Sequence, residues 1–159
     1  MKEILEILER DSRTSAERIA AMIGRNIEEV KKAIKKLEDE NIIAGYTTVI
    51  NWEKTDAELV TALIEVKATP MRDKGFDKVA KRIYSFPEVK ALYLMSGSFD
   101  FTVLIEGRTM KEVALFVAEK LAPLDSILST STHFVLKKYK DEGVILNEKV
   151  EDDREVITL

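Results

Sequence analysis

The sequence predicts an α+β protein in two parts, three short helices followed by a β-α-β-β-α-β domain. Apolar residues recur at helical spacing three times before about residue 40, and capping residues separate these runs. The remaining two-thirds contains four stretches in which apolar residues alternate, and two amphipathic helical stretches lie between them. A chain of 159 residues with an apolar fraction of 45% has enough apolar surface for one domain or two small ones.

The first two predicted helices are defined by apolar spacing and by capping residues. The opening helix places its apolar side chains within Ile4–Leu8 and ends before Thr14. Thr14 lies three residues before Glu17, which is the capping-box arrangement that satisfies free N–H groups at a helix start. The second helix buries apolar residues of the stretch 19–23 and ends at Gly24.

The third predicted helix begins after Asn26, a good N-cap, and runs to about Glu40. Its apolar residues follow a 3-4-3 pattern: Ile27, Val30, Ala33, Ile34 and Leu37. Only Gly24 and Arg25 separate the second helix from Asn26. Two helices joined by so short a turn, after a supporting first helix, predict a helix-turn-helix over residues 1–46. The second helix of such a pair fits the major groove of DNA.

The candidate DNA contacts lie on the third helix and at its N-terminal tip. The side opposite the apolar stripe carries Lys31, Lys32, Lys35 and Lys36. These lysines suit phosphate contact, and Arg25 and Asn26 lie at the tip, where groove contact usually begins. The alternative is that the lysines form a solvated helix face. Glu28 and Glu29 would repel phosphate near the tip.

The charge of the chain is not that of a strongly basic DNA-binding protein. Its 25 basic and 29 acidic residues give a net charge of −4, and neither the part before Ile50 nor the part after it is basic. Any DNA affinity must therefore come from a local patch that is presented several times in an oligomer.

The second part predicts the ferredoxin-like β-α-β-β-α-β order. A linker strand, within residues 47–60, is expected to precede a ferredoxin-like domain over residues 61–140. The expected elements are strands at 61–68, 89–95, 99–105 and 127–139, with helices at 76–86 and 110–121. Gly97 and Ser98 predict a tight type II′ hairpin between the second and third strands. The polar, acidic tail at 141–159 is either frayed or packed on a neighbouring subunit.

Several features of residues 11–51 occur together in one order along the chain. They are Asp11-x-Arg13-x-Ser15, Ile19-Ala20, Gly24, Leu37-Glu38, Ile42-Ile43-x-Gly45-Tyr46 and Asn51. This stretch resembles the DNA-binding half of the Lrp/AsnC (feast/famine, leucine-responsive) transcriptional regulators. The resemblance implies a (winged) helix-turn-helix, and it adds Ser15 to the candidate DNA contacts. Glu28 and Glu29 depart from the family, whose members commonly have serine or threonine and few acids there.

The hairpin residues Gly97, Ser98, Phe99 and Asp100 match the Gly-x-(Tyr/Phe)-Asp motif of the effector-binding and assembly domain of the same family. The resemblance implies that an effector, typically an amino acid, binds between neighbouring dimers. Asp100 would hold its ammonium group, and backbone N–H groups of the glycine turn would hold its carboxylate. Ser98 replaces an acidic residue that is often found after the glycine, so a basic effector is not favoured.

Two further candidate effector residues, Thr130 and Thr132, alternate onto one face of the last predicted strand. The resemblance implies that small polar residues of this strand line the effector pocket. The alternative is the ordinary preference of threonine for strands.

These observations together predict a sequence-specific, DNA-binding transcriptional regulator of amino-acid or nitrogen metabolism. Its expected partners are double-stranded DNA, a small effector and further copies of itself, as homodimers that assemble into an octamer or a similar ring. We expect a cytoplasmic protein without a membrane segment, since no apolar run approaches the ~18 residues of a transmembrane helix and Met1–Arg13 has no signal-peptide core.

The alternatives to a regulator are an enzyme and an assembly module that senses a metabolite without binding DNA. With no cysteine and a single histidine, His133, the chain lacks the parts of a metal site or a nucleophile–histidine pair. No phosphate-binding GxxxxGK[ST] or GxGxxG motif is present, so no cofactor is expected. A relative of this architecture that decarboxylates sirohaem would be expected to carry more basic and histidine groups. The assembly module is favoured by the net negative charge of the chain and by the pair Glu28 and Glu29 at the start of the third helix.

Overall fold

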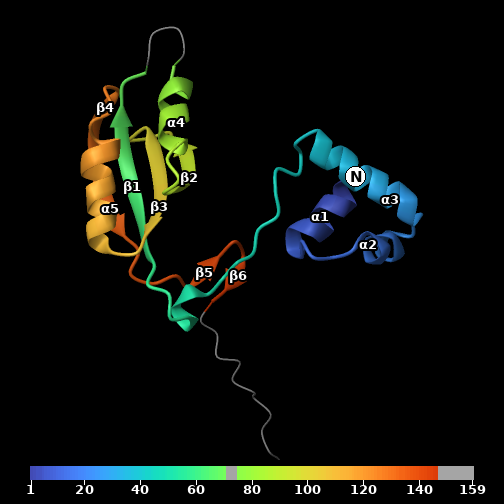
Figure 1. The fold of residues 1–159 in the computed structure, drawn as a ribbon. Coiled ribbons are helices and arrows are strands. Elements are labelled where there is room, and N and C mark those ends of the chain that lie inside the picture. The colour runs from blue at the N-terminus through green and yellow to red at the C-terminus, as the bar shows by residue number, and fades with distance from the viewer. Residues whose placement is uncertain (71–74, 147–159) are drawn as a thin grey trace, which may run out of the picture. The chain divides into compact units, whose positions relative to one another are not determined.

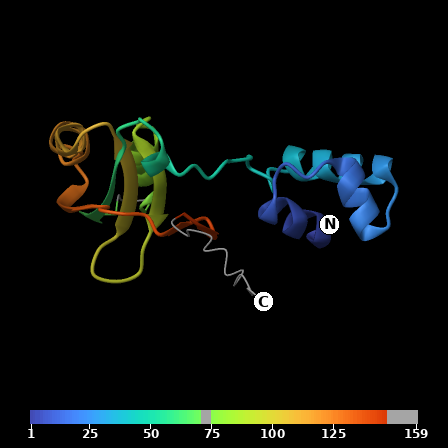
Figure 2. The same cartoon turned by 90° about the horizontal axis from the view of Figure 1, so that it is seen from below.

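The computed structural model describes residues 1–70 and 75–146 and divides the chain into two compact units. We call Met1–Ile50 the first unit and Asn51–Leu159 the second unit. The first unit consists of three helices, which gather into one cluster in both views (Figures 1 and 2). They are α1 (Lys2–Arg10), α2 (Ala16–Ile23) and α3 (Ile27–Asp39). The three helices predicted from the apolar spacing are therefore present.

The core of the first unit is formed by apolar residues from all three helices. Those of α1 and α3 are spaced four and seven positions apart and so share one face of their helix, whereas α2 contributes two adjacent residues. The buried members of this core are Ile4, Leu8, Ile19, Ala20, Val30 and Leu37. Gly24 ends α2 in the left-handed conformation, with φ of +65°, which costs glycine little because it has no Cβ. The Arg25 N–H then donates to the Ala20 carbonyl at 3.0 Å, and α3 begins two residues later.

The start of α2 differs from the prediction by one residue. Ser15, and not Thr14, is the N-cap, and its hydroxyl accepts from the Arg18 N–H at 3.3 Å. Thr14 lies in the preceding turn, where its N–H donates to the Asp11 carbonyl at 3.1 Å. Both residue types are good N-caps. Because Thr14 is part of the turn that is hydrogen-bonded to Asp11, the helix begins one residue later and Ser15 is the cap.

The expected linker strand at 47–60 is not formed, because no strand lies between α3 and β1, which begins at Val60. The segment is irregular and contains one short 3-10 helix, η1 (Trp52–Lys54). A strand is stabilised by hydrogen bonds to a neighbouring strand. Among the described residues no strand lies beside the segment 47–59, so it has no partner for such hydrogen bonds.

The second unit contains a four-stranded antiparallel sheet with the strand order β2-β3-β1-β4. Its strands are β1 (Val60–Ala68), β2 (Val89–Leu94), β3 (Phe101–Gly107) and β4 (Ile127–Phe134). The helix α4 (Asp77–Tyr84) connects β1 to β2. A second helix, α5 (Met110–Phe116), continues as the π-helical stretch η2 (Val117–Leu121) and connects β3 to β4. This is the predicted ferredoxin-like order.

One face of the sheet is covered by both helices and forms the core of the second unit. Residues paired across strands point to the same face, and Ile64 is paired with Val103 on β3. Both side chains are fully buried, together with Val79 of α4 and Val113 of α5. We call the opposite side the open face; its members include Leu63, Glu65, Tyr93, Thr102, Leu104, Ser131 and His133.

The chain after β4 folds differently from the long last strand that was predicted. β4 ends at Phe134 and not at Tyr139, and a small hairpin follows, formed by β5 (Lys140–Asp141) and β6 (Val144–Ile145). The side-chain amide of Asn51 donates to the Leu146 carbonyl at 2.7 Å, which ties this hairpin to the start of the second unit. The remainder of the predicted tail, 147–159, lies outside the described residues.

Among the described residues, no helix has the length and apolar character that a membrane crossing requires.

Truncating Leu37, which is fully buried in the first unit, should lower the free energy of unfolding of that unit. We expect Leu37→Ala to cost about 2–5 kcal/mol, because the lost apolar contacts leave a cavity. Thermal denaturation followed by circular dichroism measures this as an earlier unfolding step. The matched control is Met22→Ala, since Met22 is 59% exposed on α2. Equal shifts for the two variants would contradict the assigned core.

Candidate functional site

The tip of α3 is held in place by Asn26 and Arg25. The Asn26 side-chain oxygen accepts from the Glu28 N–H at 2.8 Å, so this residue caps the helix. The Arg25 guanidinium lies 3.9 Å from the Glu3 carboxylate of α1. Both predicted contact residues therefore already have structural partners, although each remains exposed. Ser15 likewise serves as the cap of α2.

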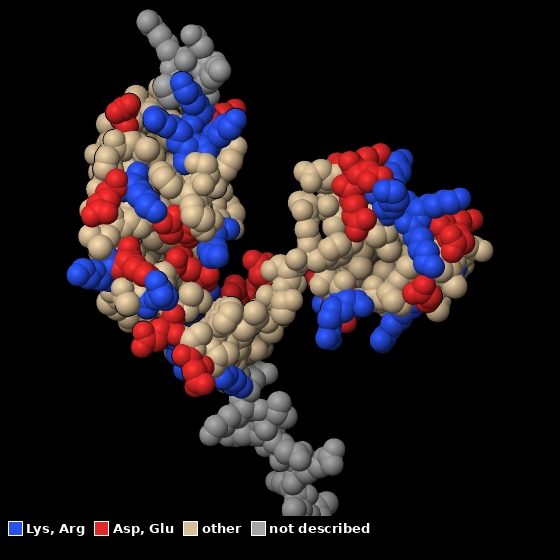
Figure 3. Space-filling model, viewed as in Figure 1, with Lys and Arg blue, Asp and Glu red and all other residues tan. Residues whose placement is uncertain are grey.

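The lysines of α3 are exposed as predicted, but most of them pair with carboxylates. Lys31 lies 3.3 Å from Glu17 of α2 and 3.6 Å from Glu28. Lys35 pairs with Asp39 within the helix at 3.2 Å, and Lys36 pairs with the C-cap residue Glu40 at 3.6 Å. In the described part of the chain Lys32 has no ion pair. Blue and red side chains are accordingly interleaved over the first unit (Figure 3).

The ion pair between α2 and α3 shifts the pKa of both partners. The pKa of Lys31 is raised by its hydrogen bond to Glu17 and by the negative charges of Glu17 and Glu28. The pKa of Glu17 is lowered first by a hydrogen bond from its own backbone N–H, and then by side-chain hydrogen bonds from Ser15 and Lys31 and by the positive charge of Lys31. Both groups therefore stay charged at neutral pH. Sequence spacing within a single helix gave no signal of this pair, because the partners lie on different helices.

Exposed ion pairs of this kind stabilise a fold only weakly and are screened by salt. The lysines of α3 can therefore exchange their carboxylate partners for DNA phosphates at small cost. The helix as a whole brings no net charge, since it carries four lysines and four acidic residues. Binding of α3 to a polyanion therefore requires that the carboxylates paired with its lysines move away from them.

In the second unit, Asp100 is hydrogen-bonded to the end of β1, one of the two inner strands of the sheet. One oxygen of its carboxylate accepts from the Ala68 N–H at 2.8 Å, and its own N–H donates to the Val66 carbonyl at 2.9 Å. Ala68 is buried at the end of β1. The residue that was expected to hold an ammonium group therefore also has a structural role, which the motif alone did not reveal.

The turn between β2 and β3 is longer than the predicted type II′ hairpin. The Met95 N–H donates to the Asp100 carbonyl at 2.8 Å, so the four residues 96–99 form the turn. Gly97, with φ of +142°, adopts a conformation that L side chains rarely reach. The glycine is therefore required, as predicted, but by a four-residue turn and not by a two-residue one.

Thr130 and Thr132 do share one face of β4, and that face is the one covered by the helices. Thr130 is paired with Val66 and Thr132 with Ile64, and both of these partners are fully buried. Val66 is also paired with Phe101 on its other side. The Asp100 motif and Thr130 thus flank the same end of β1, separated by two strand spacings, roughly 10 Å.

The open face of the sheet carries a polar group that we did not select from the sequence. His133 Nε2 lies 3.5 Å from a Glu65 oxygen and 3.3 Å from the Ser131 hydroxyl oxygen. The alternation that placed the threonines on one face also places Ser131 and His133 on the other. The partner on β1, Glu65, is determined by strand pairing and has no local signal in the sequence.

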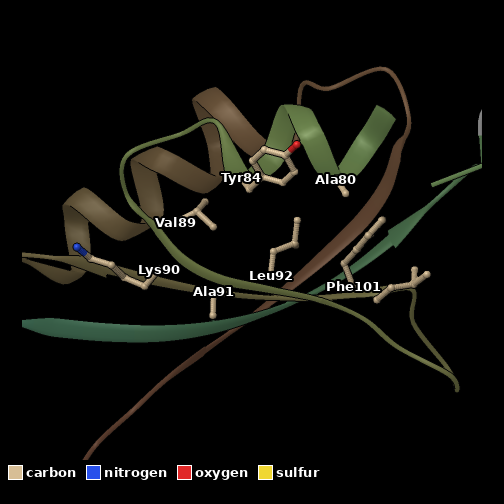
Figure 4. Close-up of a pocket in the computed structure, with 8 residues that line it drawn as sticks. Ala80, Tyr84, Val89, Lys90, Ala91, Leu92 and Phe101 are labelled. Carbon is tan, nitrogen blue, oxygen red and sulfur yellow. The ribbon is translucent and has the colours of Figure 1, made fainter. Parts of the chain in front are cut away.

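A groove with a volume of about 520 Å³ lies between α4 and the edge strand β2. In Figure 4 Leu92 and Phe101 point from the sheet toward α4, whereas Ala91 points to the opposite side.

A second hollow, of about 310 Å³, lies beside α5 and contains the Glu88–Lys120 ion pair. The hydrogen bond from Lys120 lowers the pKa of Glu88, although partial burial opposes this effect. The predicted effector residues line neither hollow.

Comparison with known proteins identifies both units. Residues 1–44 match the model of a winged helix-turn-helix DNA-binding domain, and residues 61–145 match that of the Lrp/AsnC ligand binding domain. The chain is 52% identical to the uncharacterized HTH-type transcriptional regulator YugG of Bacillus subtilis, over 98% of this chain and 93% of the relative. It is 33% identical to the HTH-type transcriptional regulator LrpA of Pyrococcus horikoshii, over 87% of this chain and 96% of the relative.

Solved structures show the same fold. Escherichia coli AsnC matches with a TM-score of 0.65 and 22% identity, over 86% of this chain and 90% of AsnC. The Neisseria meningitidis regulator NMB0573, solved as a complex with L-Met, matches with a TM-score of 0.70 and 22% identity, over 87% of this chain and 89% of that protein.

A helix-turn-helix joined to a ligand-binding ferredoxin-like domain defines a DNA-binding transcriptional regulator, which is not an enzyme. The chain belongs to the Lrp/AsnC family of these regulators. The resemblance inferred from the sequence motifs is thereby confirmed, and the decarboxylase alternative has no support in these relatives.

Replacing Asp100 tests its structural role. Asp100→Ala leaves the buried Ala68 N–H without an acceptor, and we expect the free energy of unfolding of the second unit to fall by about 1–3 kcal/mol. Asp100→Asn keeps an acceptor oxygen and should cost less. Urea denaturation followed by circular dichroism measures both. Equal losses in the two variants would show that the negative charge, and not the hydrogen bond, stabilises this end of β1.

Proposed function

We propose that this regulator controls genes of amino-acid or nitrogen metabolism, and that a small effector, an amino acid, modulates its binding to specific DNA sites. The observation that carries the proposal is the joining of an exposed lysine-bearing α3 to a ligand-binding domain in one chain. Two relatives support the metabolic assignment. One, 27% identical, is the proline dehydrogenase transcriptional activator of Rhizobium radiobacter, and the other was solved as a complex with L-Met.

Dimerisation through the open face of the sheet supplies two copies of α3 for a pseudo-palindromic site. The support for this interface is the apolar area that the face exposes to solvent in a single chain. Leu63 and Leu104 are paired at its centre and only half-buried, and Tyr93 beside them is 57% exposed. Dimers then assemble into octamers or similar rings in the cytoplasm, where their DNA lies.

The effector binds where dimers meet, at the Gly97–Asp100 hairpin, and Thr130 and Thr132 complete the pocket. The hairpin supports this role because the Asp100 carboxylate uses one oxygen for Ala68 and keeps the other for a ligand ammonium. An effector changes DNA binding by its differential affinity for two states of the assembly. Such a pocket is incomplete in a single chain.

A second candidate function is a metabolite-sensing assembly module that no longer binds DNA. It is favoured by the balanced charge of α3 and by the carboxylate partners of Lys31, Lys35 and Lys36. The two functions differ in whether a specific DNA complex forms at low salt.

Binding to the DNA upstream of the protein's own gene distinguishes these functions. We expect a specific complex whose affinity falls steeply with salt, because lysine–phosphate contacts release counterions. Lys32→Ala and Lys36→Ala should weaken binding by similar factors on all sequences, as phosphate contacts do. Lys2→Ala is the matched control, since Lys2 also forms an exposed pair four residues along its helix. The absence of a specific complex at low salt, with or without amino acids, would favour the assembly module.

The effector assignment is tested with Asp100→Asn, which removes the charge but keeps an acceptor for the Ala68 N–H. A thermal-shift screen of the twenty amino acids on the wild type identifies binders as ligands that raise the melting temperature. We expect the variant to lose this shift while it still forms dimers in analytical ultracentrifugation. Asp125→Asn, at an exposed position, should keep the shift. A normal shift in Asp100→Asn would place the ammonium site elsewhere.

A further inference from the structure

The helix α4 of the second unit carries basic side chains that the described structure leaves without carboxylate partners. Lys78, Lys81 and Arg82 are all exposed, and none of them forms an ion pair within the described residues. Blue side chains gather over the end of the second unit where α4 lies (Figure 3). The helix contains one acidic residue, Asp77, so its eight residues carry a net charge of +2.

The spacing of these residues places them on one side of α4. Lys81 and Arg82 follow Lys78 by three and four positions, and such residues are neighbours on a helix surface, with Cβ atoms roughly 5–6 Å apart. The apolar side chains Val79 and Ile83, which are buried in the core of the second unit, occupy the opposite side. The three cations therefore form one patch directed at solvent, which we call the α4 patch.

Stabilisation of the helix accounts for only part of this patch. Lys81 and Arg82 lie in the last turn, where a cation interacts favourably with the helix dipole. Lys78 lies in the first turn, where the dipole disfavours a cation. Repulsion between the three like charges adds a further cost. The position of Lys78 therefore indicates a role outside the folding of α4.

The contrast with α3 indicates what that role is. Three of the four α3 lysines are paired with carboxylates, and that helix has no net charge. A DNA-binding protein with a net charge of −4 needs unneutralised cations to hold a polyanion. The α4 patch supplies three such cations on the second unit, which matches a ligand binding domain.

We propose that the α4 patch is a second DNA contact, in which Lys78, Lys81 and Arg82 bind backbone phosphates without reading the base sequence. Arginine can bind one phosphate in a bidentate manner, whereas each lysine acts as a point charge. The contact rests on the DNA-binding function of the chain, and it adds sequence-independent affinity to the specific contacts of α3. A DNA that contacts both α3 and the α4 patch makes more phosphate contacts than one that contacts α3 alone.

The test uses the full-length triple variant Lys78→Gln, Lys81→Gln, Arg82→Gln and the DNA upstream of the protein's own gene. Affinity is measured at several salt concentrations, and the slope of log K against log salt counts the phosphate contacts. We expect the slope to become shallower by about 0.9 for each lost contact, hence by up to roughly 2.7 for each engaged chain. The single variant Lys78→Gln should change the slope by about a third of this amount.

The matched control is Lys54→Gln, Lys111→Gln, Lys140→Gln, which removes the same charge from three scattered, exposed lysines of the second unit. We expect its slope to equal that of the wild type. Sedimentation and thermal denaturation should give the same oligomer and melting temperature for wild type and both variants.

The outcomes separate this proposal from the DNA-binding function itself. If the wild type forms a salt-sensitive complex and the triple variant keeps the same slope, the α4 patch contacts no DNA. Equal changes in both triple variants would show a general effect of net charge and would also overturn the proposal. A weaker complex with an unchanged slope, or a changed oligomer, would assign the patch to contacts between protein chains. If the wild type forms no complex, the DNA-binding function fails first.

Discussion

The second unit depends on the central strand β1, which is hydrogen-bonded to β3 on one side and to β4 on the other. Its alternate residues Ala62, Ile64 and Val66 are fully buried beneath the helices, so this strand holds both layers together. Asp100 closes the end of the strand through the Ala68 N–H. The position of the hairpin, and with it that of the candidate effector site, thus follows from its hydrogen bonds to the end of β1.

In the first unit the equivalent constraint is the short turn at Gly24, which fixes α3 against α2 and brings Lys31 beside Glu17. The same packing that presents α3 therefore also neutralises part of its charge. A DNA-binding helix with balanced charge gains little affinity from its own lysines, so cations elsewhere on the chain become more important for holding a polyanion. The α4 patch on the second unit is the source of such cations that we propose.

Most of the fold could be predicted because its signals are local. Apolar spacing, the Asn26 cap and the alternation along the strands each depend on neighbouring residues, and they gave the helices, the strands and the element order of a ferredoxin-like domain. The errors arose where two local signals competed or where a partner was missing. Thr14 and Ser15 are both good caps, and an isolated stretch such as 47–50 becomes a strand only beside another one.

The sequence by itself determined the family, the two-part architecture and the requirement for glycine at position 97. It also determined which lysines are exposed on α3, because helical periodicity separates them from the core. Only the tertiary structure decided which charges are neutralised, since Glu17 and Lys31 come from different helices. It likewise decided that Asp100 holds the end of β1 and that His133 meets Glu65. Contacts between residues far apart in the chain are set by packing and strand register, and local patterns do not encode either one.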